Sequence, residues 1–232
     1  LRDEMKRLRG ILADDGVLMQ VVVDELKAIR DTYGNDRRTR IEGAVGVYTD
    51  EDLIAEEDMV VTCSHLGYVK RTAPKEFRAQ RRGGRGVAGT DTKAEDFVER
   101  LFVASTHAYL LVFTHVGKVY WVKVHQLPVG GRTARGRPLV NMIQMGSDER
   151  VSAILPVREF VDAYVVTASK NGTVKKSPLS DYSRPRASGI IGAGIADGDE
   201  IIAAQLVTDE QDILLGTKKA MAIRFKASEL RS

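Results

Sequence analysis

The stretch MVVTCSHLGYVKR, residues 59–71, places two short apolar and β-branched runs on either side of a turn at Gly67. This pattern predicts a β-hairpin, in which a tight turn joins two antiparallel strands. Three later stretches repeat it: LLVFTHVGKVYWV (110–122), VVTASKNGTVKKS (165–177) and ILLGTKKAMAIRF (213–225). The chain is therefore built on an internal repeat whose unit contains one hairpin.

The repeat has a period near fifty residues, which is typical of propeller-like folds. Gly67, Gly117, Gly172 and Ala220 occupy the same turn position and lie 50, 55 and 48 residues apart. Further apolar runs flank the hairpins: RLFVAST, RVSAILPV and EIIAAQLV before them, PLVNMI and GIIGAGI after them. Each unit thus counts about four strands. We expect a mainly β fold with four-stranded antiparallel blades in an incomplete ring.

The first 33 residues carry a helical pattern instead. VLMQVVVDELKAIRDTY (17–33) has apolar residues at steps of 3, 4, 3 and 4, at Met19, Val22, Leu26, Ile29 and Tyr33. Asp14 and Asp15 can cap this helix at its start, and Gly34 can end it. LRDEMKRLRGIL has similar spacing but is separated from it by ADDG. Two antiparallel helices and one broken arm both fit this sequence.

These patterns divide the chain into three parts. We expect a helical arm segment at 1–33, a linker and entry into the first blade at 34–57, and a partial propeller-like domain at 58–232. The last part holds about four repeats, of which the fourth stops at Ser232 before its second half. Because the chain starts at Leu1 rather than Met, we expect it to be a piece of a longer protein.

Composition excludes several classes of protein. Lys and Arg number 35 and Asp and Glu 32, so the net charge is only +3, and any affinity for polyanions depends on where the charge lies. Cys63 is the only cysteine, which excludes an internal disulfide and a multi-cysteine metal site and suits a reducing cytosol. The four histidines lack metal-ligand spacing. No apolar run approaches the length of a membrane span.

Basic, glycine-containing loops follow the hairpins at nearly fixed offsets. QRRGGRG ends at Gly86 and GRTARG at Gly136, each 19 residues after its turn glycine, and SRPRASG ends at Gly189. In a radial array the same loop of each blade returns to the same rim. We therefore expect a continuous positive stripe along one edge. It would include the segment Gln80–Gly86 together with further basic residues of the rim: Lys70, Arg71, Lys123, Arg132, Arg135, Arg137, Lys175, Lys176, Arg184, Arg186, Arg224 and Lys226.

Such a stripe fits a polyphosphate backbone. Each Lys or Arg that neutralises a phosphate releases counterions, which gives an affinity that is independent of sequence and steeply dependent on salt. Glycines let backbone amides approach phosphates closely. Aromatic residues make up only 6% of the chain, which leaves few stacking platforms for single strands. Duplex DNA bent around the rim is the simplest ligand.

QRRGGRG at Gln80–Gly86 resembles the signature box of the C-terminal domain of the bacterial DNA gyrase A protein, a Gln-basic-Arg-Gly-Gly-basic-Gly motif. Other segments resemble this family in the same order. VVVDELKAIRDTYGNDRRTRI is similar to the end of the arm that leaves the breakage-reunion core, and HLGYVK, ARGRP, DERVSAILPV and NGTVKK are similar to successive blades. The resemblance covers essentially the whole chain.

The resemblance implies a β-pinwheel, a relative of the propeller in which neighbouring blades exchange strands and duplex DNA wraps around a basic rim. The box residues that would contribute to wrapping are Gln80, Arg81, Arg82, Gly83, Gly84, Arg85 and Gly86. It also implies a place in a cytoplasmic type IIA topoisomerase that introduces negative supercoils. The partners would be the gyrase B protein and a second gyrase A protein, with ATP and Mg²⁺ used by the holoenzyme and no cofactor or metal in this fragment.

The resemblance assigns no catalytic residue to this chain. The family cleaves DNA with a tyrosine that follows an arginine, and none of the seven tyrosines here does so. One alternative is the A protein of topoisomerase IV, whose related domain usually carries a degenerate box, whereas the box here is intact. A second alternative, from another class, is a protein-interaction propeller with an incidentally basic rim.

Overall fold

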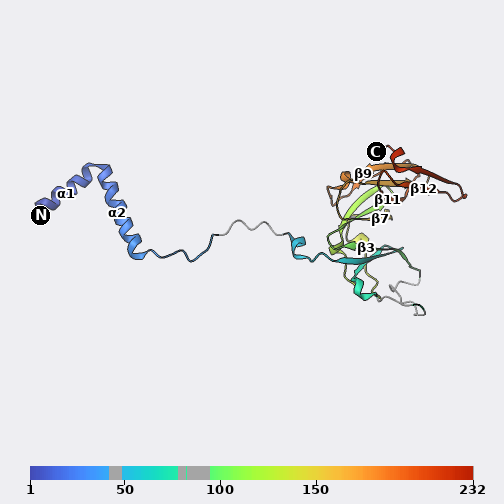
Figure 1. Cartoon of the computed structure of the whole chain (residues 1–232), viewed down its shortest axis with the longest axis horizontal. Coiled ribbons are helices and arrows are strands. Elements are labelled where there is room, and N and C mark those ends of the chain that lie inside the picture. The colour runs from blue at the N-terminus through green and yellow to red at the C-terminus, as the bar shows by residue number, and fades with distance from the viewer. Residues whose placement is uncertain (42–48, 78–81, 83–94, 232) are drawn as a thin grey trace. The chain divides into compact units, whose positions relative to one another are not determined.

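The computed structural model describes residues 1–41, 49–77, 82 and 95–231 (Figure 1). Residues 1–47 and 48–232 form two compact units. The predicted limits of the three parts of the chain remain a prediction, although residues 49–57 belong to the second unit.

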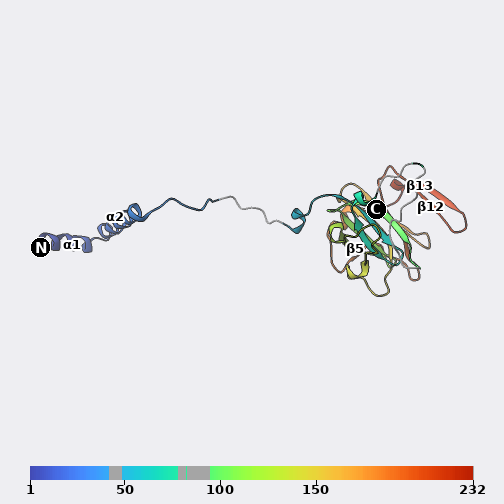
Figure 2. The same cartoon turned by 90° about the horizontal axis from the view of Figure 1, so that it is seen from below.

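The first unit consists of two helices, α1 (Arg2–Ala13) and α2 (Asp15–Tyr33). Asp14 separates them and caps α2, because its carboxylate accepts a hydrogen bond from the Gly16 amide at 2.7 Å. The Gly34 amide ends α2 by donating to the Arg30 carbonyl at 2.6 Å. Neither helix has a buried residue. Of the two arrangements that the sequence allowed, the structure has an arm broken at Asp14 (Figure 2).

The second unit contains the four predicted hairpins. They pair β1 (Asp58–Ser64) with β2 (Tyr68–Thr72), β4 (Tyr109–Thr114) with β5 (Lys118–Lys123), β8 (Tyr164–Ser169) with β9 (Val174–Pro178), and β12 (Asp212–Gly216) with β13 (Ala222–Lys226). All four equivalent turn residues have positive φ: 78° at Gly67, 81° at Gly117, 92° at Gly172 and 57° at Ala220. The repeat is therefore confirmed at the level of backbone conformation.

The strands between the hairpins do not pair with the hairpins that we expected from the sequence. β3 (Val98–Ser105) and β6 (Arg137–Pro138) flank the β4–β5 hairpin in sequence, yet the first sheet has the order β3-β1-β2-β6. The second sheet repeats this scheme with β7 (Val151–Val157) and β10 (Ile190–Ile191), in the order β10-β5-β4-β7. The third has the order β11-β8-β9, with β11 at Ile201–Val207. In the first two blades one outer strand, β3 or β7, follows the hairpin directly, and the other, β6 or β10, comes from beyond the next hairpin. This corrects the grouping of strands before and after their own hairpin.

The fourth strand of a blade is also much shorter than the apolar runs suggested. Within PLVNMI, only Pro138 lies in a strand, and Leu139–Asn141 forms a 3₁₀ turn, η4. Pro138 lacks an amide hydrogen, so it suits the outer edge of the sheet. The other 3₁₀ turns are η1 (Asp50–Leu53), η2 (Pro74–Glu76), η3 (Val124–Gln126), η5 (Leu179–Tyr182) and η6 (Ala227–Glu229).

The hydrophobic core lies between the blades. Alternate residues of β4 point to opposite faces of its sheet, so Leu110 and Val112 join a cluster shared with the first blade, whereas Leu111 and Phe113 join one shared with the third. All four are at most 1% exposed. The predicted mainly β, propeller-like fold with antiparallel blades is confirmed, and its stability depends on contacts between successive blades.

Two of the turn glycines provide a test of the strand exchange. An added Cβ at Gly117 would overlap the carbonyl of Ala193, which belongs to the segment that crosses over from the third repeat, whereas one at Gly172 would meet nothing within 4 Å. We expect Gly172→Ala to cost about 1–2 kcal/mol for its left-handed backbone alone. Gly117→Ala should cost about 1–3 kcal/mol more because of the overlap. Urea unfolding, followed by fluorescence of the single tryptophan, Trp121, measures both; equal losses would contradict the close approach.

Candidate nucleic-acid interface

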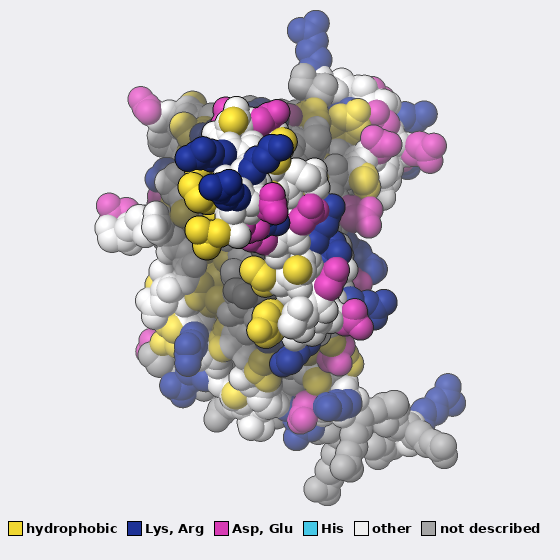
Figure 3. All heavy atoms as spheres, turned by 90° about the vertical axis from the view of Figure 1, so that its left-hand side faces the viewer, with side chains coloured by type: hydrophobic (Ala, Val, Ile, Leu, Met, Phe, Trp, Pro, Cys, Tyr) yellow, Lys and Arg dark blue, Asp and Glu magenta, His cyan; other side chains and the backbone are white. Residues whose placement is uncertain are grey.

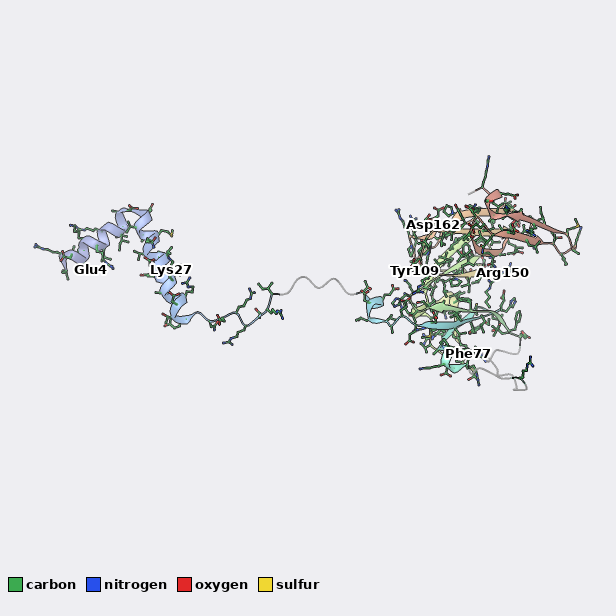
Figure 4. The ribbon with its side chains drawn as sticks, viewed as in Figure 1. Glu4, Lys27, Phe77, Tyr109, Arg150 and Asp162 are labelled. Atoms are coloured by element: carbon green, nitrogen blue, oxygen red, sulfur yellow. The ribbon has the colours of Figure 1, made fainter. Side chains whose placement is uncertain are left out.

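The box segment lies almost wholly outside the described residues. This applies to Gln80, Arg81, Gly83, Gly84, Arg85 and Gly86, whereas Arg82 is described and exposed. Phe77, the last described residue before the segment, follows the 3₁₀ turn η2 after β2 (Figure 4). The box therefore stays a prediction, and the described part of the site consists of the later crossover loops and the second strands of the hairpins.

Four predicted arginines lie free at the surface: Arg135, Arg184 and Arg186 on crossover loops, and Arg137 at the start of β6. Arg135 and Arg137 follow the second hairpin, and Arg184 and Arg186 follow the third; all four are exposed. Among the described residues, no hydrogen bond or ion pair holds their guanidinium groups. On the face that Figure 3 shows, basic and acidic side chains intermingle. The four arginines thus combine exposure, the absence of an acidic partner and a place in or next to a crossover loop.

Two predicted lysines are buried, which corrects their assignment to the outer surface of the rim. Lys70 is 1% exposed, and its ammonium donates to the carbonyls of Gly131 at 3.2 Å and Arg132 at 2.5 Å. Burial lowers the pKa of Lys70. Lys176 is 5% exposed and lies 2.5 Å from the Asp209 carboxylate. Both ammonium groups already hold parts of the fold together, so neither is available to a phosphate.

Lys123 is also occupied within the fold. Its ammonium pairs with Glu51 at 2.7 Å, donates to the His107 carbonyl at 2.8 Å and lies 3.8 Å from the ring centre of Tyr109. Tyr109 lies at the start of β4 (Figure 4). Glu51 belongs to the acidic segment 50–58, DEDLIAEED, whose Glu56 pairs in turn with Arg158 at 2.6 Å. These ion pairs attach the segment to the second blade, and the Ser105 hydroxyl of β3 in the first blade also donates to Glu56.

The remaining predicted basic residues have mixed roles. Arg71 donates from Nε to the Leu127 carbonyl at 2.9 Å, and burial lowers its pKa. Lys175 is exposed but donates to the Gly192 carbonyl at 3.0 Å. Arg224 pairs with Asp212, and Lys226 is exposed. Arg132 is half-buried and belongs to the first described loop.

Sequence reasoning missed a repeated contact between blades. The fourth residue after each of the first three turn glycines donates to a backbone carbonyl just after the next hairpin: Arg71 to Leu127, Trp121 to Tyr182 at 2.8 Å, and Lys176 to Ala227 at 3.1 Å. The chemistry of the donor changes, but the position does not. The equal spacing of these donors from their turn glycines is the sequence feature that could have predicted the contact. Because Arg71 and Lys176 make the same contact as Trp121, they are scaffold cations, which support the fold.

The described residues offer little else for chemistry. They contain no group of three or more His, Cys, Asp or Glu side chains that could hold a metal ion. No helix among them is long and apolar enough to span a membrane. The site is therefore a set of exposed arginines on loops that the neighbouring blade supports.

A family described as "DNA gyrase C-terminal domain, beta-propeller" matches residues 58–105, 108–158, 163–208 and 211–232. The chain belongs to this family. Each matched segment of the gyrase C-terminal domain starts at or just before a hairpin, so the family repeat and the structural repeat coincide. The resemblance found in the sequence is confirmed.

Relatives and solved structures agree with this membership of the gyrase C-terminal domain family. The DNA gyrase A protein of Salmonella typhimurium is 45% identical over 93% of this chain, which spans 25% of that relative. A crystal structure of the C-terminal domain of DNA topoisomerase IV superposes with a TM-score of 0.63 and 28% identity, covering 76% of this chain and 54% of that one. A structure of a DNA gyrase A C-terminal domain superposes with a TM-score of 0.61 and 23% identity, covering 75% of this chain and 56% of that one. The chain thus spans about a quarter of the length of its curated relative.

Cys63 provides a chemical test of the packing in this gyrase C-terminal domain. Its thiol is 4% exposed, and burial raises its pKa to about 11. Because the thiolate is the nucleophile, we expect iodoacetamide at pH 8 to alkylate Cys63 far more slowly in the native chain than in urea. The native rate should rise as the pH approaches 11 while the fold persists. Mass spectrometry of quenched samples measures both rates, and fast native labelling at pH 8 would contradict this packing.

Proposed function

We propose that this chain binds duplex DNA without sequence preference and serves as the DNA-wrapping domain of a gyrase A protein. One observation carries the proposal: Arg135, Arg137, Arg184 and Arg186 are exposed, have no partner among the described residues, and lie in or next to equivalent crossover loops of successive repeats. Exposed cations spaced in this way suit the regularly spaced charges of a DNA backbone. The box segment Gln80–Gly86 adds three arginines to the same series.

Contacts to phosphates fix the path of DNA without reading its bases. DNA that follows several loops in turn must bend, and the additional phosphate contacts along the path offset the bending energy. In the holoenzyme, with the gyrase B protein and a second gyrase A protein, this path would present a neighbouring DNA segment to the cleaved gate. Cleavage and hydrolysis of ATP with Mg²⁺ would take place in other parts of that cytoplasmic assembly.

The A protein of topoisomerase IV is a second candidate. The similarity to the topoisomerase IV C-terminal domain, at 28% identity, favours it. The intact QRRGGRG motif favours gyrase, because the related domain usually carries a degenerate box. An assay of DNA wrapping separates the two candidates. A gyrase-type domain should change the writhe of closed circular DNA, and this change should require the box.

We expect the chain to shift the topoisomer distribution when nicked circular DNA is ligated in its presence. Arg81→Ala/Arg82→Ala/Arg85→Ala should reduce this shift and weaken binding, because phosphate contacts are lost. For three lost contacts, the slope of log K against log salt should fall in magnitude by about 3. Gel electrophoresis of the ligated circles and fluorescence anisotropy with a short duplex provide the two measurements.

The matched control removes the same charge from the helical unit, through Arg2→Ala/Arg7→Ala/Arg9→Ala on α1. This control should bind and wrap like the wild type. An unchanged topoisomer shift in the box variant would remove the box from the mechanism. Wild-type binding that does not respond to salt would overturn the proposed phosphate interface.

A further inference from the structure

A tight turn, Gly131–Ala134, forms the tip of the first described basic loop. The Ala134 amide donates to the Gly131 carbonyl at 3.0 Å, so Arg132 and Thr133 occupy the two central positions of the turn. Arg135 follows immediately and is exposed. The turn therefore combines two arginines with a compact piece of backbone.

Lys70 lies beneath this turn. Its ammonium donates to the carbonyl oxygens of Gly131 and Arg132, at 3.2 and 2.5 Å, from a position that is 1% exposed. In a trans peptide, the amide hydrogen points opposite to the preceding carbonyl. Since both carbonyls point inward to Lys70, the amides of Arg132 and Thr133 point outward. Two successive outward amides form an anion-binding concavity.

The loop around the turn is fixed to the first blade. Thr72 donates from Oγ1 to the Gly130 carbonyl at 2.9 Å, and the Gly130 amide donates to the Arg71 carbonyl at 3.0 Å. Gly136, with φ of 87°, passes so close to Val69 that an added Cβ would overlap the Val69 carbonyl. The loop thus has a defined conformation before any ligand arrives, which lowers the entropy cost of binding.

One side-chain donor in the turn still lacks an acceptor. The Nε of Arg132 is enclosed and has no hydrogen-bond partner among the described residues. Unpaired buried donors are uncommon and call for an acceptor. A phosphate held on the outward amides would bring oxygen atoms to the same turn, where the Arg132 Nε reaches them once its side chain turns outward.

We propose that the turn Gly131–Ala134 is a preformed site for one backbone phosphate of the bound duplex, and that Lys70 is the positioning residue that builds it. The inference rests on the proposed function and deepens it. The phosphate accepts hydrogen bonds from the amides of Arg132 and Thr133, with the Arg132 and Arg135 guanidiniums beside it. Lys70 does not touch the DNA: it holds the two carbonyls inward.

The equivalent position in the next hairpin shows that this arrangement is specific to the first described loop. Tyr120 takes the place of Lys70 there, and an added Cβ at Gly189 of the next loop would lie 2.8 Å from its ring. The Tyr120 hydroxyl donates to Glu149 at 3.1 Å instead of to loop carbonyls. The second loop is therefore supported by an aromatic ring, and among the described residues no lysine or arginine side chain donates to the carbonyls of residues 183–189; Lys175 reaches only the later Gly192 carbonyl.

Lys70→Met tests the proposal, because methionine keeps the length and apolar stem but removes the donors. We expect about tenfold weaker binding to a short duplex, the loss of about one charge-assisted contact. Lys176→Met is the matched control, because Lys176 is a buried lysine that also donates to a backbone carbonyl, in another blade. It should bind like the wild type. Thermal unfolding of both variants measures the stability that each buried lysine contributes.

A double-mutant cycle distinguishes positioning from direct contact. In an Arg132→Ala/Arg135→Ala background, Lys70→Met should weaken binding by much less than tenfold, because the site it builds is already impaired. Full additivity, or wild-type affinity of Lys70→Met alone, would overturn the proposal. If Lys70→Met does not fold, Thr72→Val loosens the same loop with the lysine in place and should weaken binding in the same direction.

Nuclear magnetic resonance of the chain with inorganic phosphate tests the site independently of DNA wrapping. The amide signals of Arg132 and Thr133 should shift together in the wild type and stay unchanged in Lys70→Met or Thr72→Val. If phosphate shifts these amide signals but the chain does not bind duplex DNA, the anion site stands and the proposed function is overturned. Duplex binding without these shifts, in phosphate or in DNA, would retain the function and overturn the site.

Discussion

The antiparallel pairing of each crossover strand with the preceding hairpin is the constraint on which this fold depends. Tyr68 pairs with Pro138 and Val69 with Arg137, so only two residues of β6 enter the first sheet. That short pairing nevertheless brings a loop from the second repeat onto the first blade. The two described basic loops, after the second and third hairpins, are therefore each supported by the preceding repeat, and these loops and the blade contacts form together.

This pairing explains why positive charge has two roles in the chain. Three cations on second strands, Lys70, Arg71 and Lys176, donate to backbone carbonyls of the next repeat. An arginine within the loop has no such partner and stays exposed, as Arg135 and Arg184 do. Enclosing an ammonium is costly unless several acceptors surround it. For Lys70 the carbonyls of the crossover loop supply acceptors, whereas Lys176 has the Asp209 carboxylate beside the Ala227 carbonyl.

The sequence predicts those features that depend on local pattern. The hairpins, the positive-φ turns at Gly67, Gly117 and Gly172, and the basic character of the loops are all visible in short stretches. The burial of Lys70 is not, because the loop that covers it lies some sixty residues later in the chain. The same holds for the length of β6, which the run PLVNMI overstates: tertiary pairing, not apolar character, decides where that strand ends.

The acidic segment 50–58 also contacts a blade from another part of the chain, but through carboxylates that pair with basic side chains. Glu51 and Glu56 reach Lys123 and Arg158 on the second repeat, and the Thr106 hydroxyl donates to the Ala55 carbonyl at 2.8 Å. Lys123 follows a hairpin turn, as the scaffold cations do, but its partner is a carboxylate from the entering chain. Ion pairs of this kind weaken with salt, whereas hydrogen bonds to buried carbonyls are screened far less. The carbonyl hydrogen bonds between blades should therefore persist at high salt, whereas exposed ion pairs such as Glu56–Arg158 and Arg150–Glu200 should weaken.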